Sequence, residues 1–335
     1  MFSRLKRIWR PEQFHFHHAI NRDRAYFEGW YFKLVDAEGA RPHAIIPGVF
    51  LGADAHAFIQ VLNGRDGTSA YHRFPLHEFH ASRDSFDISI GRSRFTQSRI
   101  SLDIGARETA AQQPVKGEID LSSWHGWPVT LTSPGVMGPY SFVPFMECNH
   151  GILSMDHAIA GQLSIGDVHT CLDDGRGYVE KDWGRGFPKG YVWAQSNHFS
   201  EEGISISASV ADIPWLTGAF RGYLIGFLLR GKLHRFTTYT GARIEYIDVN
   251  KNAYTLCVRD RQYRLQLQAQ RSEGALLHAP YDKQMVARVA ETMNSVIKLR
   301  FEGLDNGKRL YEGAGEHGCL EVQGDLANII MDGPS

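Results

Sequence analysis

Alternation of apolar and polar residues is the feature of this sequence that most constrains its fold. Residues 204–210 read ISISASV and residues 263–270 read YRLQLQAQ, so every second side chain is apolar in both segments. The same period of two recurs in four further segments, which are FDISI (86–90), RISLDI (99–104), GEIDL (117–121) and VIKLRF (296–301). This pattern places the apolar side chains on one face of a strand and is typical of antiparallel sheets with one buried face.

Turn-forming dipeptides separate the alternating segments. They are Asn63-Gly64, Asp66-Gly67, Asp174-Gly175, Glu202-Gly203 and Asn306-Gly307. Pairs of this kind join neighbouring antiparallel strands through short connections. The sequence lacks the regular alternation of strands and helices that a doubly wound parallel sheet needs, so that fold class is excluded.

One segment predicts a short helix in the C-terminal half. Residues 282–294 read DKQMVARVAETMN and begin with Asp282, which is suitable as an N-cap. Their apolar side chains fall on one helical stripe, formed by Met285, Val286, Val289, Ala290 and Met293.

The middle of the chain predicts a junction between two halves. Residues 133–151 contain three prolines and several glycines, which favour bends over a regular strand. Segments rich in aromatic residues, glycine and tryptophan stand at 26–31 and again at 178–184. We therefore predict an all-β protein with two barrel-like antiparallel halves, residues 12–160 and residues 161–330.

Composition and charge exclude several function classes. The net charge of -1 offers no electrostatic basis for binding nucleic acid. No apolar run reaches the 18 residues that a membrane-spanning helix requires. The four cysteines, Cys148, Cys171, Cys257 and Cys319, form no CxxC pair, which argues against a thiolate zinc site or a disulfide framework and favours a cytoplasmic location.

The N-terminal segment MFSRLKRIWR combines basic and large apolar residues. No apolar stretch follows it, so we do not expect a secretory signal. Residues 2–10 are a candidate for peripheral contact with a membrane surface, and a frayed basic terminus is the alternative.

Residues 178–199, YVEKDWGRGFPKGYVWAQSNHF, carry the densest mixture of charged and aromatic side chains. On a strand, Glu180 and Asp182 share one face, whereas Lys181 and Trp183 share the other. Two carboxylates on an inner wall would raise the pKa of one of them, as a general acid requires. The alternative is an ion-pair cluster that closes the end of a barrel.

The strand that follows within this segment also sorts into two faces. Tyr191, Trp193, Gln195, Asn197 and Phe199 form an aromatic and amide wall suited to a ligand with a flat polar head. The other face carries Val192, Ala194, Ser196 and His198, and His198 there is either a catalytic candidate or a hydrogen-bonded core histidine.

Two other segments hold candidate residues. In YFEGWYFKL (26–34), Glu28 shares a face with Trp30, and burial there would raise the pKa of its carboxyl unless an ion pair forms. In FMECNHG (145–151), Glu147, Asn149 and His150 form a polar group within an apolar stretch. Their spacing matches no standard metal motif, so no metal site is predicted. There is also no P-loop, dinucleotide fingerprint or GxSxG elbow.

Three segments resemble the tocopherol cyclase family. They are YFEGWYFK (26–33), EKDWGRGFPKGYVWAQSNHF (180–199) and the late APYDKQMVARV…LRFE segment. The family's central motif reads much like E-K-N-W-G-x-x-F-P-x-x-W-x-W-x-Q-x-N-x-F. The residues that match it are Glu180, Lys181, Trp183, Gly184, Phe187, Pro188, Trp193, Gln195, Asn197 and Phe199. The chain departs from it at Asp182 and Tyr191, and residues 134–151 resemble the shorter bacterial members. A more distant resemblance to carotenoid 1,2-hydratases implies that the two halves are lipocalin-like barrels.

The resemblance implies protonation of a prenyl double bond, followed by attack of a phenol hydroxyl on the cation to close a chromanol ring. No cofactor is needed, and the substrate is small and lipophilic. Glu180 or Asp182 would be the acid, with Glu28 as the second choice. Gln195, Asn197 and His198 would hold the quinol head, and Trp30, Tyr191 and Trp193 would flank the cation. Lys181, Trp183, Glu147 and Asn149 complete the residues expected to contact the substrate.

Two alternatives use the same residues. Water could replace the phenol as nucleophile, which would make the protein a hydratase of an isoprenoid alkene. The protein could instead be a non-catalytic, lipocalin-like carrier of a lipid or quinone. An enzyme requires at least one carboxylate inside the cavity, whereas a carrier requires only apolar walls.

Overall fold

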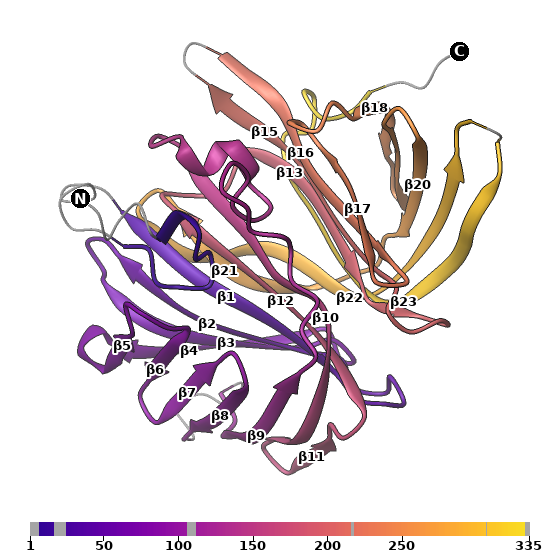
Figure 1. Cartoon of the computed structure of the whole chain (residues 1–335). Coiled ribbons are helices and arrows are strands. Elements are labelled where there is room, and N and C mark those ends of the chain that lie inside the picture. Colours follow the sequence, from indigo (N-terminus) through magenta and orange to yellow (C-terminus); the bar gives the residue numbers. More distant parts are fainter. Residues whose placement is uncertain (1–6, 17–24, 106–111, 216–217, 306, 332–335) are drawn as a thin grey trace. The chain divides into compact units, whose positions relative to one another are not determined.

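The computed structural model describes residues 7–16, 25–105, 112–215, 218–305 and 307–331, and strands dominate them (Figure 1). The elements in chain order are β1 (Tyr26–Val35), β2 (His43–Leu51), β3 (His56–Asn63), β4 (Thr68–Pro75), η1 (Leu76–Glu78), β5 (Phe79–Ala81), β6 (Asp87–Ile90), β7 (Ser93–Thr96), β8 (Arg99–Ile104), β9 (Val115–Ser122), η2 (Gly138–Phe142), β10 (Cys148–Ile165), β11 (Val168–Cys171), β12 (Gly175–Gly184), β13 (Gly190–Ser196), β14 (His198–Phe199), β15 (Ser205–Trp215), β16 (Gly218–Leu229), β17 (Lys232–Thr237), β18 (Arg243–Val249), β19 (Ala253–Arg259), β20 (Tyr263–Gln270), β21 (Ala275–Tyr281), β22 (Gln284–Gly303) and β23 (Arg309–Gly324). The elements η1 and η2 are single turns of 3₁₀ helix.

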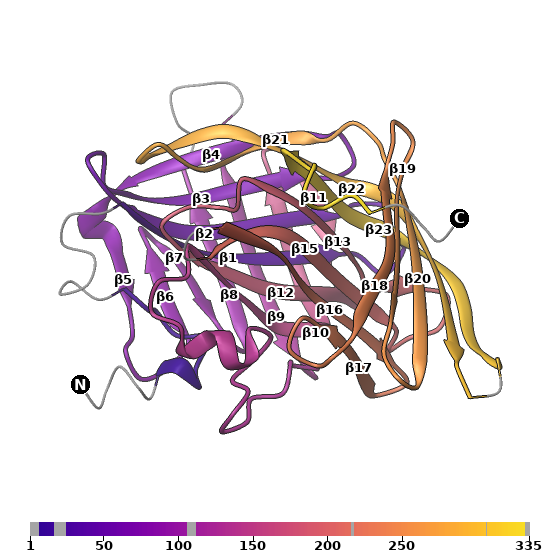
Figure 2. The ribbon, with the colours of Figure 1, turned by 90° about the horizontal axis from the view of Figure 1, so that it is seen from above.

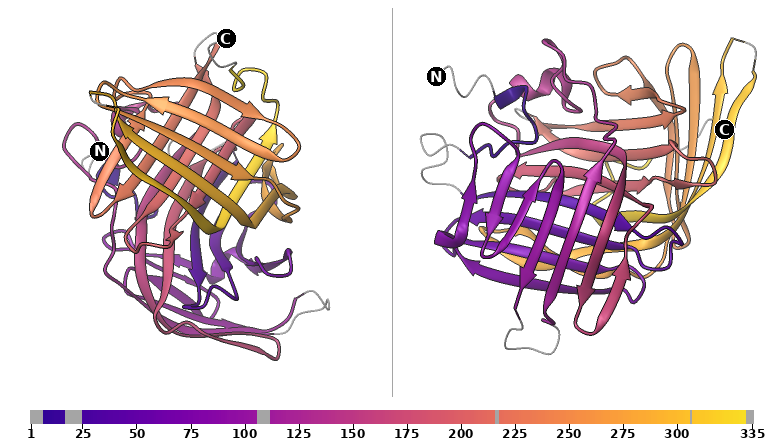
Figure 3. Two further views of the ribbon diagram at one scale, coloured as in Figure 1. Left: turned by 90° about the vertical axis from the view of Figure 1, so that its right-hand side faces the viewer. Right: turned by 60° about the horizontal axis from the view of Figure 1, so that its bottom comes forward.

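The first compact unit comprises Met1–Phe187 and Leu276–Arg288. Its sheet has the order β4-β3-β2-β1-β12-β10-β9-β8-β7-β6-β5, with β11 paired to β10. The right panel of Figure 3 shows strands of this sheet side by side. Its core is apolar and includes Trp30, Phe32 and Leu34 from β1, all fully buried. Strand β1 pairs with β2 on one side and β12 on the other, so it is central and buried over nearly its whole length.

The second compact unit comprises Pro188–Ala275 and Val289–Ser335. Most of its residues belong to a sheet of the order β17-β16-β15-β13-β23-β22-β20-β19-β18, with β14 paired to β23. Strand β21 from Leu276 onward, which pairs with β22, and the first residues of β22 belong to the first unit. Strands β18, β19 and β20 run beside one another in antiparallel pairs (Figure 2). Apolar side chains such as Ile206, Phe227 and Phe301 form its core.

The period-two segments are confirmed as strands. Residues 263–270 are β20 and residues 99–104 are β8, while the segments at 86–90, 117–121 and 204–210 overlap β6, β9 and β15. The prediction of an all-β protein with two antiparallel sheets is therefore confirmed.

The helix predicted over residues 282–294 is wrong, because most of this segment belongs to strand β22. Asp282 and Lys283 both have positive φ, 43° and 64°, and form the turn before β22 rather than a helix N-terminus. From Val289 to Ile297 the odd-numbered side chains are buried, as a strand requires. Glu291 is one of them, at 1% exposure, and a buried carboxylate hides the alternation from sequence inspection.

The predicted boundary between residues 160 and 161 falls within strand β10, whereas the chain passes from one compact unit to the other between Phe187 and Pro188. Strand β10 pairs with both β9 and β12, so its hydrogen bonds hold the whole strand within the first unit. No helix among the described residues is long and apolar enough to span a membrane.

Candidate functional site

Pairing between β1 and β12 sorts the predicted site residues of the first unit onto two faces. Trp30 lies opposite Lys181, and Glu28 lies opposite Trp183. Directly opposed residues point to the same side of an antiparallel sheet, so these four side chains share the core face. Glu180 and Asp182 point to the other face, as the alternation predicted.

Glu28 and Lys181 form an ion pair that is completely buried. Lys181 Nζ lies 2.5 Å from Glu28 Oε1, and both side chains have no exposed surface. Glu28 also accepts hydrogen bonds from the Tyr26 hydroxyl (2.6 Å) and from the backbone N–H of His15 (2.8 Å). The ammonium group lies 4.8 Å and 4.5 Å from the ring centroids of Trp30 and Trp183, which adds cation–π stabilisation.

These partners keep Glu28 ionised. Burial acts to raise the pKa of its carboxyl, but Lys181 and His15 together outweigh it and hold that pKa below its ordinary value. The expectation that burial beside Trp30 would raise this pKa is therefore wrong, and the alternative of an ion pair holds. Burial, with the Lys181 charge, lowers the pKa of His15, so the ring is neutral. Its Nδ1 accepts from Lys181 at 2.8 Å while Nε2 donates to the Arg7 carbonyl at 3.1 Å.

The ion pair also fixes the segment from Trp9 to His15 over the core face. Lys181 donates to the backbone carbonyls of Pro11 and Gln13, and the Trp30 indole N–H donates to that of Glu12 at 3.1 Å. A buried ammonium must satisfy its three N–H groups, and here two backbone oxygens of this segment share them with Glu28 and His15. The geometry is that of a structural clamp.

On the opposite face, Glu180, Asp182 and His150 form a second cluster, which we call the His150 cluster. His150 comes from β10, where it lies opposite Asp182. Its Nδ1 lies 2.9 Å from Asp182 Oδ1, and its Nε2 lies 3.7 Å from Glu180 Oε2. The Tyr178 hydroxyl donates to Glu180 at 2.6 Å. The imidazole thus stands between two carboxylates, an arrangement that can hold and transfer a proton.

The His150 cluster is more accessible than the Glu28–Lys181 pair. The side chain of Asp182 is 28% exposed, that of His150 13% and that of Glu180 7%. The ligand atoms of the three residues lie within 4.8 Å of one another, so they could hold a metal ion although the sequence predicted no metal site. Glu147 directly precedes β10, and Asn149 lies within it opposite Trp183, to whose carbonyl its Nδ2 donates at 3.3 Å.

The predicted residues of the second unit lie along β13 and its continuation. Val192 and Ala194 pack in the core, as predicted, whereas Tyr191 donates from its hydroxyl to Glu321 at 2.6 Å. Trp193, Gln195 and Asn197 are buried, and the Asn197 side-chain oxygen accepts from Gln195 at 3.4 Å. Their contact with a substrate stays a prediction.

The alternation predicted for the end of this segment is wrong. The chain leaves β13 after Ser196 and resumes as β14 at His198, so the period is interrupted at Asn197. Phe199 therefore packs in the core, while His198 lies beside Asn197, with 3.1 Å between Nδ1 and Oδ1, and contacts the ring of His317.

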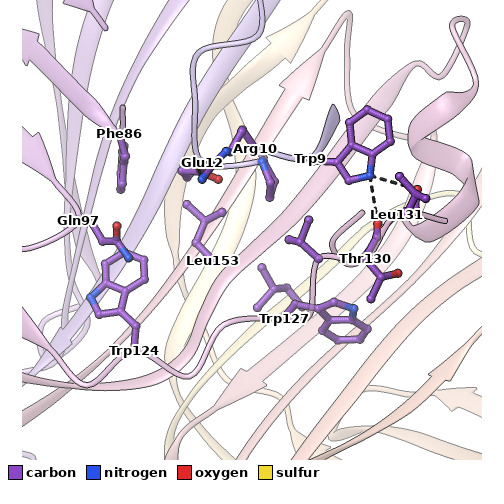
Figure 4. A pocket seen from close by; sticks show the side chains of 13 residues that line it. Trp9, Arg10, Glu12, Phe86, Gln97, Trp124, Trp127, Thr130, Leu131 and Leu153 are labelled. Carbon is purple, nitrogen blue, oxygen red and sulfur yellow. Dashed lines mark hydrogen bonds and ion pairs between the residues drawn. The ribbon is translucent and has the colours of Figure 1, made fainter. Parts of the chain in front are cut away.

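The first unit also contains a cavity of about 620 Å³, which we call the tryptophan cavity (Figure 4). Its volume lies in the range of small-molecule sites, roughly 300–1,000 Å³. Phe86, Gln97 and Trp124 line one end, and Trp9, Trp127 and Leu131 line the other. None of the residues predicted to contact substrate lines it. Trp124 and Trp127 follow β9 in an irregular segment, where no periodicity marked them as cavity residues.

Sequence reasoning also missed the partners of the two acids. Tyr26 and Tyr178 each stand two residues before a glutamate on the same strand face and donate a hydroxyl hydrogen bond to it. This repeated Tyr-x-Glu pattern could have revealed them, because residues i and i+2 share a face. The sequence singles out His150 with Glu147 and Asn149 as a polar group. No pattern in it connects His150 to Glu180 and Asp182, however, and none connects His15 to Glu28.

Fold and sites together define a two-sheet β protein with an aromatic cavity that is partly open to solvent and a histidine–carboxylate cluster. Residues 94–324 match the Tocopherol cyclase-like family, and the chain belongs to this family. The resemblance seen in the motifs is thereby confirmed.

A curated relative from Oryza sativa subsp. japonica bears the name "Probable tocopherol cyclase, chloroplastic". It is 25% identical over 228 residues, which cover 63% of this chain and 47% of the relative. The chain thus spans about half the length of this relative.

Solved structures share the fold. That of CghA with Sch210972 superposes with a TM-score of 0.56 at 10% identity, covering 90% of this chain and 89% of the other. A second structure of CghA gives a TM-score of 0.52 at the same identity and coverage. The prediction of two lipocalin-like antiparallel halves is confirmed at the level of the fold, and family membership supports the expectation of an enzyme.

Proposed function

We propose that this protein is an isoprenoid-modifying enzyme that cyclises a prenylated quinol, with the His150 cluster as its proton source. The observation that carries the proposal is the imidazole of His150 between the carboxylates of Asp182 and Glu180, at 2.9 Å and 3.7 Å. Membership in the Tocopherol cyclase-like family supports the reaction class.

The reaction is an isomerisation in which all atoms are retained. The cluster donates a proton to the less substituted carbon of the prenyl double bond, which leaves a tertiary cation. The phenol oxygen attacks this carbon and forms the new C–O bond, and the phenol proton returns to the cluster. Two carboxylates beside the reacting carbon stabilise the developing positive charge electrostatically.

Glu28 is the weaker candidate for the acid. Its oxygens already accept from Lys181, Tyr26 and His15, and its pKa lies below the ordinary value. A group that donates a proton near neutral pH needs a raised pKa. We therefore assign Glu28 to holding the N-terminal segment in place.

The test is incubation of the purified protein with a short-chain prenylated hydroquinone in D₂O, followed by mass-resolved chromatography. Cyclisation gives a product with a new retention time and one deuterium bound to carbon. Glu180→Gln and Asp182→Asn should each lower turnover by roughly 100-fold or more, the range of general acid catalysis. Asp120→Asn, which alters an exposed carboxylate in β9, is the matched control and should retain full turnover. Unaltered turnover in both site variants would refute the assignment.

A carrier function is the second candidate, and the tryptophan cavity favours it. The cavity walls include none of the carboxylates predicted as acids. Substrate that binds and is recovered unchanged from the wild-type protein would support a carrier, whereas a product heavier by one water would indicate hydration.

A further inference from the structure

Residues 128–145 of the first unit, which we call the 128–145 loop, expose large apolar side chains and carry no formal charge. The sequence contains no lysine, arginine, aspartate or glutamate between Asp120 and Glu147. The exposed large apolar side chains of the loop are Val129, Leu131, Phe142 and Phe145, and the exposed fraction reaches 79% for Leu131. Removing such side chains from water is favourable, so a group of them on one segment marks a contact surface.

Hydrogen bonds hold Leu131 at the tip of a tight turn. The backbone N–H of Thr130 donates to the Ser133 carbonyl at 3.1 Å, and the Thr130 hydroxyl accepts from the N–H of Ser133 at 3.1 Å. Val129 pairs with Pro134 on either side of this turn. Leu131 is therefore held in place by the backbone, while most of its side chain is in contact with water.

Trp9 connects this turn to the second exposed part of the loop. Its indole N–H is shared between the carbonyls of Thr130 and Leu131, each at 3.1 Å (Figure 4). Its ring packs edge-on against Phe142, the last residue of η2, with 5.7 Å between the ring centroids. The exposed Leu131 and Phe142 thus flank one indole and belong to a single apolar surface.

Basic side chains border this surface. Arg10 follows Trp9, its side chain is 65% exposed, and its guanidinium lies 4.0 Å from the carboxylate of Glu12, so the pair is weak. The guanidinium of the exposed Arg185 donates to the Phe145 carbonyl at 3.2 Å. Because the loop itself has no acidic residue, its border is complementary to a surface that carries negative charge.

We propose that the 128–145 loop, together with Trp9, Arg10 and Arg185, docks on the surface of a bilayer that contains anionic lipids. Leu131 and Phe142 enter the boundary between headgroups and acyl chains, and the two guanidinium groups lie among the lipid phosphates. A second copy of this chain is the less suitable occupant, because a symmetric contact would place the same basic border on both sides. The docking depends on this surface alone and not on the proposed catalysis.

The sequence predicted membrane contact through residues 2–10. Residues 2–6 lie outside the described residues, whereas Trp9 and Arg10 belong to the proposed surface. Trp9, Val129 and Leu131 also line one end of the tryptophan cavity, so a docked bilayer would lie next to that end. A lipophilic substrate would then travel only a short way through water, a consequence that, unlike the docking, rests on the proposed function.

The experiment is co-sedimentation of the purified protein with sucrose-loaded vesicles. The vesicles consist of phosphatidylcholine with about one third phosphatidylglycerol, and vesicles of phosphatidylcholine alone are the neutral control. The protein should bind the anionic vesicles more tightly than the neutral ones. Added salt should reduce this difference, because it screens the attraction between arginine and phosphate.

Variants of Leu131 test the apolar contact. Leu131→Ser should weaken binding to anionic vesicles about tenfold, since a leucine side chain then no longer leaves water. Leu276→Ser is the matched control, because this leucine in β21 of the same unit is also exposed, at 51%, and should be neutral. Leu131→Trp should strengthen binding, and lipids with brominated acyl chains should quench its added fluorescence.

Variants of arginine test the ionic contact. Arg10→Gln should weaken binding to anionic vesicles about fivefold and leave binding to neutral vesicles within twofold. Arg65→Gln, which alters an exposed arginine in the turn between β3 and β4, should change neither affinity.

Three results would overturn the proposal. They are the absence of vesicle binding, equal binding by Leu131→Ser and Leu276→Ser, and a dimer in sedimentation velocity that Leu131→Ser dissociates. The vesicles contain no quinol, so all three are obtained without turnover. Glu180→Gln should bind vesicles like the wild-type protein, which separates a failure of the docking from a failure of the proposed function.

Discussion

At the scale of single residues, the Glu28–Lys181 pair is expected to matter for stability more than for chemistry. Glu28→Gln leaves the ammonium of Lys181 buried without a counter-charge, and such a loss costs roughly 3–5 kcal/mol. Urea titration of the wild-type protein and of Glu28→Gln measures this loss as a difference in the free energy of unfolding. Lys181→Met added to Glu28→Gln should recover part of the loss, because no buried charge then remains.

The control for this prediction is an exposed ion pair. Arg99 and Asp120 lie 2.7 Å apart with side chains 58% and 59% exposed. Asp120→Asn should therefore change the free energy of unfolding by less than about 1 kcal/mol. A similarly small loss for Glu28→Gln would contradict the role of the buried pair.

The sequence could predict the faces of the site residues but not their partners. The period of two correctly separated Glu180 and Asp182 from Lys181 and Trp183, because that sorting depends only on local geometry. The charge state of each acid depends on contacts across the fold. Lys181 contacts His15, which is 166 residues away in the sequence, and Asp182 contacts His150, which is 32 residues away. The alternation of apolar and polar residues carries no information about contacts between such distant positions.

At the scale of elements, the dependence on contacts across the fold also explains why the helix predicted over residues 282–294 is wrong. Residues 285–293 contain apolar side chains that fit both a helical stripe and a strand. Only the pairing of β22 with its neighbouring strands, such as that of Glu291 and Thr292 with Glu321 and Leu320 of β23, decides between them. Strands with uninterrupted alternation, such as β20, were predictable because their apolar side chains all lie on the buried face and their polar side chains on the other.

Strand β10 provides a test at this scale. Gly161 has φ of 119°, and a Cβ there would overlap the Glu118 carbonyl of the neighbouring β9. Gly161→Ala should lower the free energy of unfolding by about 3 kcal/mol, since backbone strain and a steric clash add. Gly67→Ala, at φ of 62° with open space around it, should cost only about 1 kcal/mol. Equal costs would show that β9 and β10 separate easily.

At the scale of the whole molecule, buried neutral histidines link folding to pH. Burial lowers the pKa of His43 to about 4 and that of His157 to about 3. Both side chains lie almost completely in the interior, at 3% and 2% exposure. His157 contacts Ser154 through Nδ1 at 3.2 Å and stacks on Trp124, so its neutral ring is part of the packing behind the tryptophan cavity.

The sign of the resulting pH dependence follows from linkage. In the unfolded chain these histidines bind protons near pH 6.5, whereas in the folded protein they bind them only near pH 4 and pH 3. The unfolded state therefore holds more protons as the pH falls below 6.5, and the stability present above that pH is lost progressively. Between pH 7 and pH 4.5 each buried histidine should remove roughly 2–3 kcal/mol from the free energy of unfolding.

Urea titrations of the wild-type protein and of His157→Gln at pH 7 and pH 4.5 measure this contribution. The variant lacks the titrating ring, so its loss of stability between the two pH values should be smaller by roughly 2 kcal/mol, whatever its stability at pH 7. His77→Gln, which replaces an exposed histidine, should reproduce the wild-type difference. If His157→Gln does so too, the His157 ring becomes protonated in the folded protein as readily as in the unfolded chain. The interior behind Trp124, on which the His157 ring stacks, must then admit water.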